Sequence, residues 1–583
     1  MAPHQSHLNN VLVESLESSV NCCDGHDKQS STLLATKAVE LPSQWYIPAR
    51  YVLALWSFLG FINMFTLRMD LNIAILAMVD NSNATMQVMH VPITTAATLI
   101  NNQSSKFHWS ESDQDILLGS FFYGYCSTQI LGGYLSSKIG PKIILGVGIM
   151  INSFLSLVTP LAALKSYYLI VVIRVLQGLA QGLAQPCMHT MWSKWAPDSE
   201  KSWLMTITYS GCQVGTVIAT WATGYIADSA VLDGWPLVFY VFGGCGMIWS
   251  FGWLLLVHDT PGKHPRISQK ELEYITSNIL IPGSHISVKP RLCKILRTPA
   301  LMAIVAAHFA NDWGCFALTV CLPSYLHRVL NYHIRQNGFL SSLPFIVLVV
   351  TNPLSGYLAD MLRGRNILST KNTRKLVNSI GLFIPSALMF SVCYVDSDRN
   401  LIVALLTMAV GFSGFTMAGY SVNHLDIAPT FAGVLYGLTN TIGTTTGFIG
   451  PAILASLTGE VNNKHHWIIF FYITSGIFFF GGLVFLLLAE GEPQNWGDFQ
   501  RSRSVSYNSN YSKEVEHIQP PKVDISSDDD FLVPPQNVHS DNSIQSPETS
   551  EDLENSELEA LIDHRRQRRT ENVKSFLHMM YSF

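Results

Sequence analysis

Two arginines stand inside long apolar stretches of the chain, Arg68 in the first stretch and Arg174 in the fourth. A charged side chain there is costly unless it faces a water-filled cavity or a partner. A guanidinium holds a carboxylate through two parallel hydrogen bonds, so we predict that both arginines bind an anion. Two alternatives stay open: Arg174 extends from a helix end to the membrane interface, or Arg68 pairs with Asp70. The second needs an unwound helix, because residues two apart do not share a helix face.

A stripe of polar residues follows Arg174 at helical spacing. At 100 degrees per residue its members fall on one face of an otherwise apolar helix, which predicts a cavity lining. Interhelical hydrogen bonds are the alternative, because Gly178 and Gly182 allow close helix approach. The stripe consists of Arg174, Gln177, Gln181, Gln185 and His189.

The composition places these residues in a membrane. Of 583 residues 48% are hydrophobic and 13% charged, and the mean hydropathy is +0.25. A soluble domain carries about a quarter charged residues. The net charge of -5 gives no support for nucleic-acid binding. The sequence has no clustered nucleophile and base, no HExxH and no CxxC pair, so we predict no enzyme activity, metal or cofactor.

Windows of about twenty apolar residues predict twelve membrane helices in two sets of six. We therefore expect an all-α membrane protein of two pseudo-symmetric six-helix bundles. The predicted parts are an N-terminal tail at 1–47, bundles at 48–258 and 298–490, a connector at 259–297 and a C-terminal tail at 491–583. The expected spans are 50–79, 113–136, 143–163, 167–190, 203–227, 235–257, 298–326, 337–359, 376–395, 400–422, 431–457 and 466–489.

The distribution of Lys and Arg predicts the orientation. An even number of spans puts both tails on one side, and loops on that side, above all 259–297, hold most of the basic residues. Basic loops face the cytosol, so we expect both termini to be cytosolic. The loop 80–112 then faces the other side, where its sequons at Asn83 and Asn102 are candidate glycosylation sites.

The two halves carry a similar motif at the same place. Gly132-Gly133-Tyr134-Leu135-Ser136 closes the second predicted span, and Ser355-Gly356-Tyr357-Leu358-Ala359 closes the eighth. The first motif, with its following loop, resembles the signature of the major facilitator superfamily, G-x-L-x-D-R-x-G-R-K. Ser137 replaces the acid and Pro141 a basic residue. The matching positions are Gly133, Leu135, Lys138, Gly140 and Lys142. The resemblance implies two bundles that alternate access to a central site.

The run from Arg174 to Pro197 narrows the resemblance to the anion/cation symporters, the family of sialin, vesicular glutamate carriers and type I sodium-phosphate transporters. Further matches are 119–125, 338–344, 423–429 and 494–496, and together they are closest to the sialin branch. The resemblance covers about 50–497. It implies an organic-anion transporter whose substrate contacts, carried onto this chain, are Arg68, Tyr125, Arg174, His189, Tyr209 and Asn311. For His189 the alternative is a polar group that packs between helices.

Several positions depart from the family pattern, and they bear on the coupling ion and on the substrate. Gln177 and Gln181 stand where sialin-like carriers have glutamates, the second associated with proton coupling, and glutamine does not titrate. Asn311 stands where vesicular glutamate carriers have an arginine, which disfavours glutamate loading. Asp70 and Asp312 lie in the first and seventh spans, which are equivalent in the repeat. We hypothesise that they carry the coupling proton; the alternative is that each pairs with a neighbour.

The predicted function is secondary active transport of an organic anion such as sialic acid or an acidic amino acid. One alternative is a potential-driven or sodium-coupled phosphate or organic-anion transporter, and another is a substrate sensor on a transporter fold. We expect a monomer coupled to H+ or Na+ in a lysosomal, endosomal or plasma membrane. The tail residues Glu557, Leu561 and Ile562 fit an acidic dileucine motif for clathrin adaptors.

Overall fold

The structure is a computed structural model that describes residues 47–79, 107–227, 234–279, 295–332, 334–395, 398–458 and 464–494. The chain divides into two units, Met1–Pro48 and Ala49–Phe583, and every helix below belongs to the second. The predicted glycosylation sites Asn83 and Asn102 and the dileucine residues Glu557, Leu561 and Ile562 lie outside the described residues.

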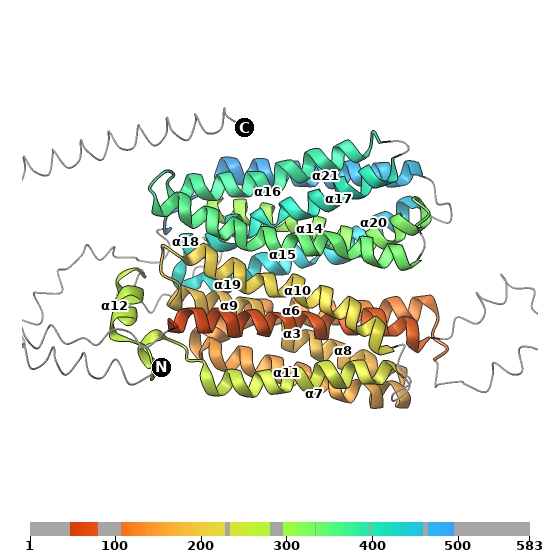
Figure 1. Ribbon diagram of the computed structural model, residues 1–583, viewed down its shortest axis with the longest axis horizontal. Helices are drawn as coiled ribbons and strands as arrows, with labels where there is room; N and C mark the ends of the chain where they lie inside the picture. Colours follow the sequence, from red (N-terminus) through yellow and green to blue (C-terminus); the bar gives the residue numbers. More distant parts are fainter. Residues whose placement is uncertain are drawn as a thin grey trace, which may run out of the picture. The chain divides into compact units, whose positions relative to one another are not determined.

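The first half of the second unit contains the helices that match the first six expected spans (Figure 1). The fourth span is divided at Leu183, just before Pro186, because proline disrupts the regular helix hydrogen bonds. Ser110 caps one helix start with a capping box, accepting from the Asp113 amide. The helices are α3 (Ala49–Met78), α6 (Glu111–Lys138), α7 (Pro141–Lys165), α8 (Tyr167–Gly182), α9 (Ala184–Trp195), α10 (Lys201–Ala227) and α11 (Trp235–Leu256).

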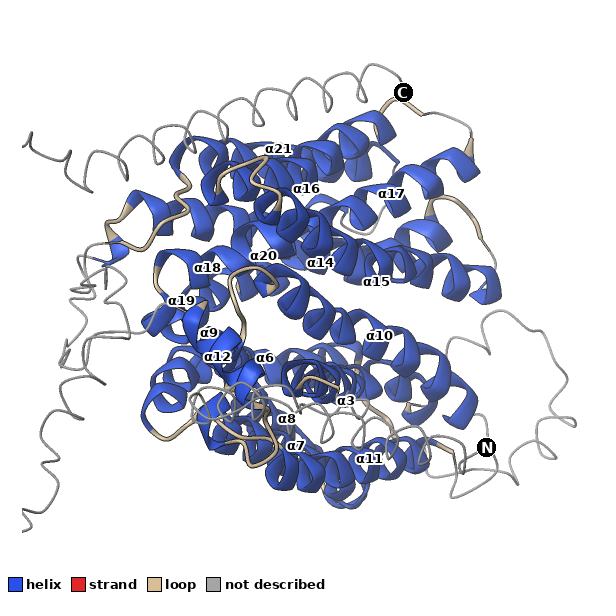
Figure 2. Cartoon of the chain, turned by 60° about the vertical axis from the view of Figure 1, so that its left-hand side comes forward, coloured by secondary structure: helices blue, strands red, loops and turns tan. Residues whose placement is uncertain are grey.

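A short helix, α12 (Gln269–Ser277), lies in the predicted connector, and the second half follows it. Its tenth span contains a π-helical segment, η4 (Met417–Ser421). The other helices are α14 (Pro299–Arg328), α15 (Ile334–Gly364), α16 (Thr370–Val392), α17 (Arg399–Ser413), α18 (Val422–Ile427), α19 (Ala432–Thr444), α20 (Thr446–Thr458) and α21 (Lys464–Leu488). Figure 2 shows the helices of each half as a separate group within the unit.

The expected all-α class is confirmed in the described residues, and each expected span has a helix, or consecutive helices, at its position. By length and hydropathy, eight segments in the described part of the chain are apolar enough to cross a membrane. The expected spans outside those eight are α6, α10, α14 and the pair α19 and α20. Of these, α6, α10, α14 and α19 contribute side chains to the central cavity described below. The helices α19 and α20 have 13 residues each, so neither is long enough to cross a bilayer by itself.

The two copies of the repeated motif lie where the halves cross. A Cβ on Gly133 of α6 would lie 2.4 Å from the Gly433 carbonyl oxygen in α19. A Cβ on Gly356 of α15 would lie 2.6 Å from the Ser202 carbonyl oxygen in α10. Both glycines therefore let the backbone of one half approach that of the other. The repeat seen in the sequence thus corresponds to two equivalent crossing points.

The rest of the signature organises the loop between α6 and α7. Gly140 has a φ of 119°, a conformation that favours glycine, and lies against the Asp259 carboxylate. The Lys142 amide donates to Asp259 at 2.9 Å, while Lys138 is exposed in the last turn of α6. In the first half Ser137 only bonds the Tyr134 carbonyl of its own helix.

Buried charges join the halves at the end of the helices near α12, which we call the connector end. Arg374 of α16 contacts the Asp426 carboxylate at 2.6 Å and the Ser202 hydroxyl at 2.7 Å. Lys201 lies 3.3 Å from the same carboxylate. Asp360 accepts from the amides of Ser202 and Trp203 at the start of α10. These contacts close the connector end in this conformation.

Candidate functional site

A cavity of about 130 Å³ lies between the two halves of the second unit. Its polar and aromatic lining comes from α3, α6, α9, α10, α14, α15, η4 and α19. Lining residues used below are Arg68, Tyr125, Gln185, Tyr209, His308, Asn311, Asp312, Tyr420, Tyr436 and Asn440. Larger pockets of about 540 and 610 Å³ elsewhere are lined mainly by apolar side chains. The smaller cavity is the candidate site, because only a site with convergent polar groups orients a charged ligand.

Arg68 is the cation of this cavity. Its side chain is 5% exposed, and its Nε and one terminal nitrogen are buried without a hydrogen-bond partner. The guanidinium carbon lies 4.9 to 5.2 Å from the ring centres of Tyr125, Phe122 and Phe121. Buried polar groups normally have partners. Arg68 is therefore held by aromatic rings with donors left over for an anion.

Arg174 has a different position from the one predicted. It does not line the cavity, and its guanidinium lies 3.9 Å from the Asp70 carboxylate and 3.0 Å from the Gln177 amide oxygen. Asp70 is fully buried and also accepts from the Leu71 amide at 2.6 Å. The acid of the first span thus pairs with Arg174 rather than with Arg68.

The polar stripe divides between packing and cavity. Gln181 donates to the Met64 carbonyl of α3 at 2.9 Å, and Gln177 accepts from Arg174 of its own helix at 3.0 Å; neither glutamine lines the cavity. Gln185 lines the cavity, and its amide oxygen accepts from Tyr125, Tyr436 and Asn440 at 3.0 to 3.2 Å. This one side chain connects α6, α9 and α19. Both readings of the stripe therefore apply, each to a different part of it.

His189 and Tyr209 form a contact beside the cavity. The Tyr209 hydroxyl lies 2.7 Å from His189 Nδ1, and the imidazole stacks on Tyr436 at 3.7 Å between ring centres. His189 is fully buried and its Nε2 lies 3.3 Å from the Ser421 carbonyl oxygen. Tyr209 therefore faces the cavity, whereas His189 supports it from behind and joins the two halves.

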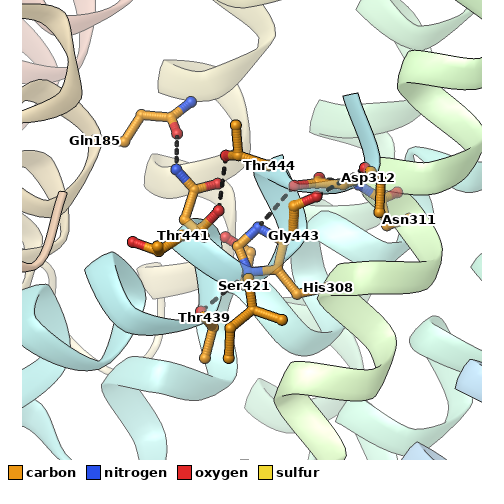
Figure 3. A network of polar contacts seen from close by, with 12 residues as sticks. Gln185, His308, Asn311, Asp312, Ser421, Thr439, Thr441, Gly443 and Thr444 are labelled. Atoms are coloured by element: carbon orange, nitrogen blue, oxygen red, sulfur yellow. Dashed lines mark hydrogen bonds and ion pairs between the residues drawn. The ribbon is translucent and has the colours of Figure 1, made fainter. Parts of the chain in front are cut away.

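Asn311 and Asp312 lie side by side on α14, as Figure 3 shows. Asn311 donates to the Tyr420 hydroxyl at 3.2 Å and accepts from the Thr416 hydroxyl at 2.8 Å. The Asp312 carboxylate lies 3.6 Å from His308 Nε2. Both predicted residues of the seventh span therefore line the cavity, whereas Asp70 does not.

Several site residues were missed in the sequence: His308, Tyr420, Tyr436, Thr439 and Asn440. His308 had a detectable signal, because it stands four residues before Asp312 and so shares its helix face. The residues from η4 and α19 had no such signal. Among the described residues, no group of three or more His, Cys, Asp or Glu side chains could hold a metal ion.

The cavity ends in an aromatic layer on the side away from the connector end. Phe122 of α6 contacts Phe316 of α14 and Phe448 of α20, with ring centres 5.9 and 5.6 Å apart. Such edge contacts join the halves without strong polar bonds. The site is thus bounded by charges at one end and by aromatic rings at the other.

Comparisons with known proteins agree with this arrangement. The chain is 42% identical to human sialin over 454 residues, covering 77% of this chain and 90% of sialin. It is 34% identical to human vesicular glutamate transporter 2 over 514 residues, covering 85% and 86% of the two chains. The family resemblance inferred from the motifs is therefore confirmed.

Solved structures share the fold. The proton:xylose symporter XylE, bound to 6-bromo-6-deoxy-D-glucose, aligns with a TM-score of 0.54 at 16% identity, covering 76% of this chain and 97% of XylE. The E. coli fucose:proton symporter FucP aligns with a TM-score of 0.53 at 12% identity, covering 76% and 100%. The family model described as Major Facilitator Superfamily matches residues 53–451. The chain therefore belongs to the Major Facilitator Superfamily, within the group that includes sialin and the vesicular glutamate transporters.

Proposed function

We propose that this protein is a secondary active transporter of organic anions that works by alternating access. Arg68 carries the proposal, because it is a buried cation that lines a cavity between the halves and has donors without partners. The names of sialin and the vesicular glutamate transporters support a carboxylate as the ligand. A carboxylate accepts two parallel hydrogen bonds from a guanidinium. Transport, rather than catalysis, is the activity that this arrangement supports.

The small size of the cavity is consistent with alternating access, in which the site opens to one side at a time. At about 130 Å³ it is well below the roughly 300 to 1,000 Å³ of typical ligand pockets. A substrate therefore enters only after the halves separate at one end. The glycine crossings at Gly133 and Gly356 and the charges around Asp426 form the contacts that would open at the connector end.

We further propose that the protein works as a monomer in a lysosomal or endosomal membrane, with both termini cytosolic and the C-terminal tail available to clathrin adaptors. The basic loops on the side of the tails support this orientation. The likeness to sialin supports the substrate class of sialic acid or an acidic amino acid.

The neutral side chains of Gln177 and Gln181 favour a second candidate, a potential-driven or sodium-coupled transporter of phosphate or organic anions. Neither glutamine titrates, and both already bond protein groups. Moving one charge across 100 mV is worth about 2.3 kcal/mol, enough to drive an anion without protons.

The test is uptake by the purified full chain in liposomes. Labelled sialic acid, aspartate and phosphate are offered under an imposed pH gradient, a sodium gradient or a potassium-diffusion potential. Saturable uptake of an organic anion would support the proposal, and the effective gradient would identify the driving force. Absence of uptake and of exchange for every anion, with specific anion binding retained, would instead support a substrate sensor.

A further inference from the structure

We propose that His308 and Asp312 together form a binding site for one coupling proton on α14, an inference that rests on the proposed anion transport. In this chain the pair would carry the proton that Gln177 and Gln181 are unable to carry, because glutamine does not titrate. The sequence made both Asp70 and Asp312 candidates for the coupling acid; the geometry favours Asp312 and adds His308 as its partner.

The chain of hydrogen bonds begins at His424. Its Nδ1 lies 2.9 Å from the Ser421 carbonyl oxygen, which only accepts, so Nδ1 carries the hydrogen. In the neutral ring Nε2 is then an acceptor. The Thr439 hydroxyl lies 2.8 Å from Nε2, closer than the 3.2 Å to its alternative acceptor, the Tyr436 carbonyl. Thr439 therefore donates to His424.

This assignment determines the state of His308. The Thr439 oxygen lies 3.0 Å from His308 Nδ1 and, having given its hydrogen to His424, accepts from that nitrogen. The neutral His308 ring is thus left with an unprotonated Nε2. That nitrogen lies 3.6 Å from the Asp312 carboxylate. Figure 3 shows the two side chains facing each other. Without a further proton two lone pairs face each other, and with one proton the pair becomes an ion pair or a carboxylic acid beside a neutral ring.

The surroundings hold the two groups together. A Cβ on Gly443 would lie 2.4 Å from an Asp312 oxygen and 3.3 Å from the imidazole, so glycine provides the space for the pair. Both side chains line the cavity, but that of His308 is 1% exposed and that of Asp312 is 15% exposed. The proton therefore enters and leaves through Asp312.

Other charged and titratable groups lie near the pair on several neighbouring elements. They are Arg68 of α3, Tyr125 of α6, His189 of α9, Tyr209 and Cys212 of α10, Cys315 of α14, Tyr420 of η4, His424 of α18 and Tyr436 of α19. Asn440, a neutral amide, also lines the cavity. Arg68 is the permanent charge among them, and no Lys or Arg in the described chain forms an ion pair with Asp312 within 4.0 Å.

Asp70 differs from Asp312 both in its exposure to the cavity and in its charge partner. It is fully buried, lies outside the cavity lining and is neutralised by Arg174 at 3.9 Å. Asp312 shares the cavity with the unpaired Arg68. An anion bound to Arg68 adds a negative charge beside Asp312, and one proton on the His308 and Asp312 pair removes it. Proton and anion therefore bind better together than apart, which is the requirement for symport.

The test compares Asp312→Asn, His308→Gln and His466→Gln in liposomes containing the full chain. Labelled sialic acid and aspartate are the probes, and each variant is described by the ratio of accumulation with and without an inward proton gradient. One coupled proton multiplies accumulation by about ten for each pH unit of gradient. We expect wild type to show this ratio, and the ratio to fall to about one in Asp312→Asn and His308→Gln. His466→Gln, at the start of α21 and outside the cavity lining, is the control and should keep the wild-type ratio.

Infrared difference spectra of the same proteins between acid and alkaline pH provide a readout that needs no transport. We expect a carboxyl band that disappears in Asp312→Asn and shifts in His308→Gln. A wild-type protein that shows the band but moves neither probe would refute the proposed function and leave the proton site standing. If the gradient ratio or the band survives unchanged in Asp312→Asn, the inference is overturned.

Discussion

The sharpest prediction concerns the two buried arginines, which resemble each other in sequence but not in their surroundings. In Arg68→Gln the substrate loses a charged partner. The protein loses the contacts of the guanidinium with the aromatic rings, but no hydrogen bond from the two nitrogens that have no partner. Hydrogen bonds to charged groups contribute about 1.5 to 3 kcal/mol. The expected result is a rise in KM of about 10- to 150-fold, since each 1.4 kcal/mol is about tenfold.

The same substitution at Arg174 has a different expected effect. Arg174→Gln leaves the Asp70 carboxylate buried without its ion pair, and breaking a buried pair costs about 3 to 5 kcal/mol. We expect low yield and a lower temperature of unfolding in detergent. Adding Asp70→Asn removes the stranded charge and should recover much of the loss.

The assays are uptake in liposomes for KM and the heat-induced loss of the monodisperse chromatographic peak for stability. Arg68→Lys is the matched variant, because it keeps the charge but loses the planar fork, and its KM should lie between wild type and Arg68→Gln. The reasoning is refuted if Arg68→Gln transports with wild-type KM, or if Arg174→Gln is as stable as wild type while its KM rises.

Two further predictions concern the connector end and its neighbourhood. Gly133→Val should lose transport while still reaching the membrane, because its side chain would collide with the Gly433 backbone in the closed state; Gly119→Val in the same helix, where a Cβ meets nothing within 4 Å, is the control and should transport normally. Burial raises the pKa of Glu200, but hydrogen bonds and the charge of Arg50 outweigh burial and leave the pKa below its usual value. The stabilisation from this pair is therefore present above the ordinary Glu pKa of about 4.3 and lost as the pH falls through the lowered value, so unfolding temperatures of wild type and Glu200→Gln should converge in acid. If the unfolding temperatures of wild type and Glu200→Gln differ by the same amount at neutral and at acid pH, this assignment is contradicted.

The fold was predictable because membrane spans are local features. Each expected span needs only a run of apolar residues long enough to cross the bilayer, and all found helices at their positions. The repeat was equally visible, since Gly133 and Gly356 occupy equivalent places in the two halves and both lie at crossings. The predicted cavity lining was only partly correct. Helical periodicity shows which residues share a face of a helix, but it does not show whether that face borders the cavity or packs against another helix.

Residue types and spacing therefore decided the membrane class, the two halves and a set of polar candidates that includes Arg68 and Asp312. The tertiary structure decided which candidates are engaged and which are free. Asp70 comes from α3 and Arg174 from α8, and only the packing of those helices neutralises both and leaves Arg68 available. Likewise, Thr439 of α19 connects His308 of α14 to His424 of α18. A charge or a hydrogen bond depends on its nearest partner in space, and helix packing determines that partner.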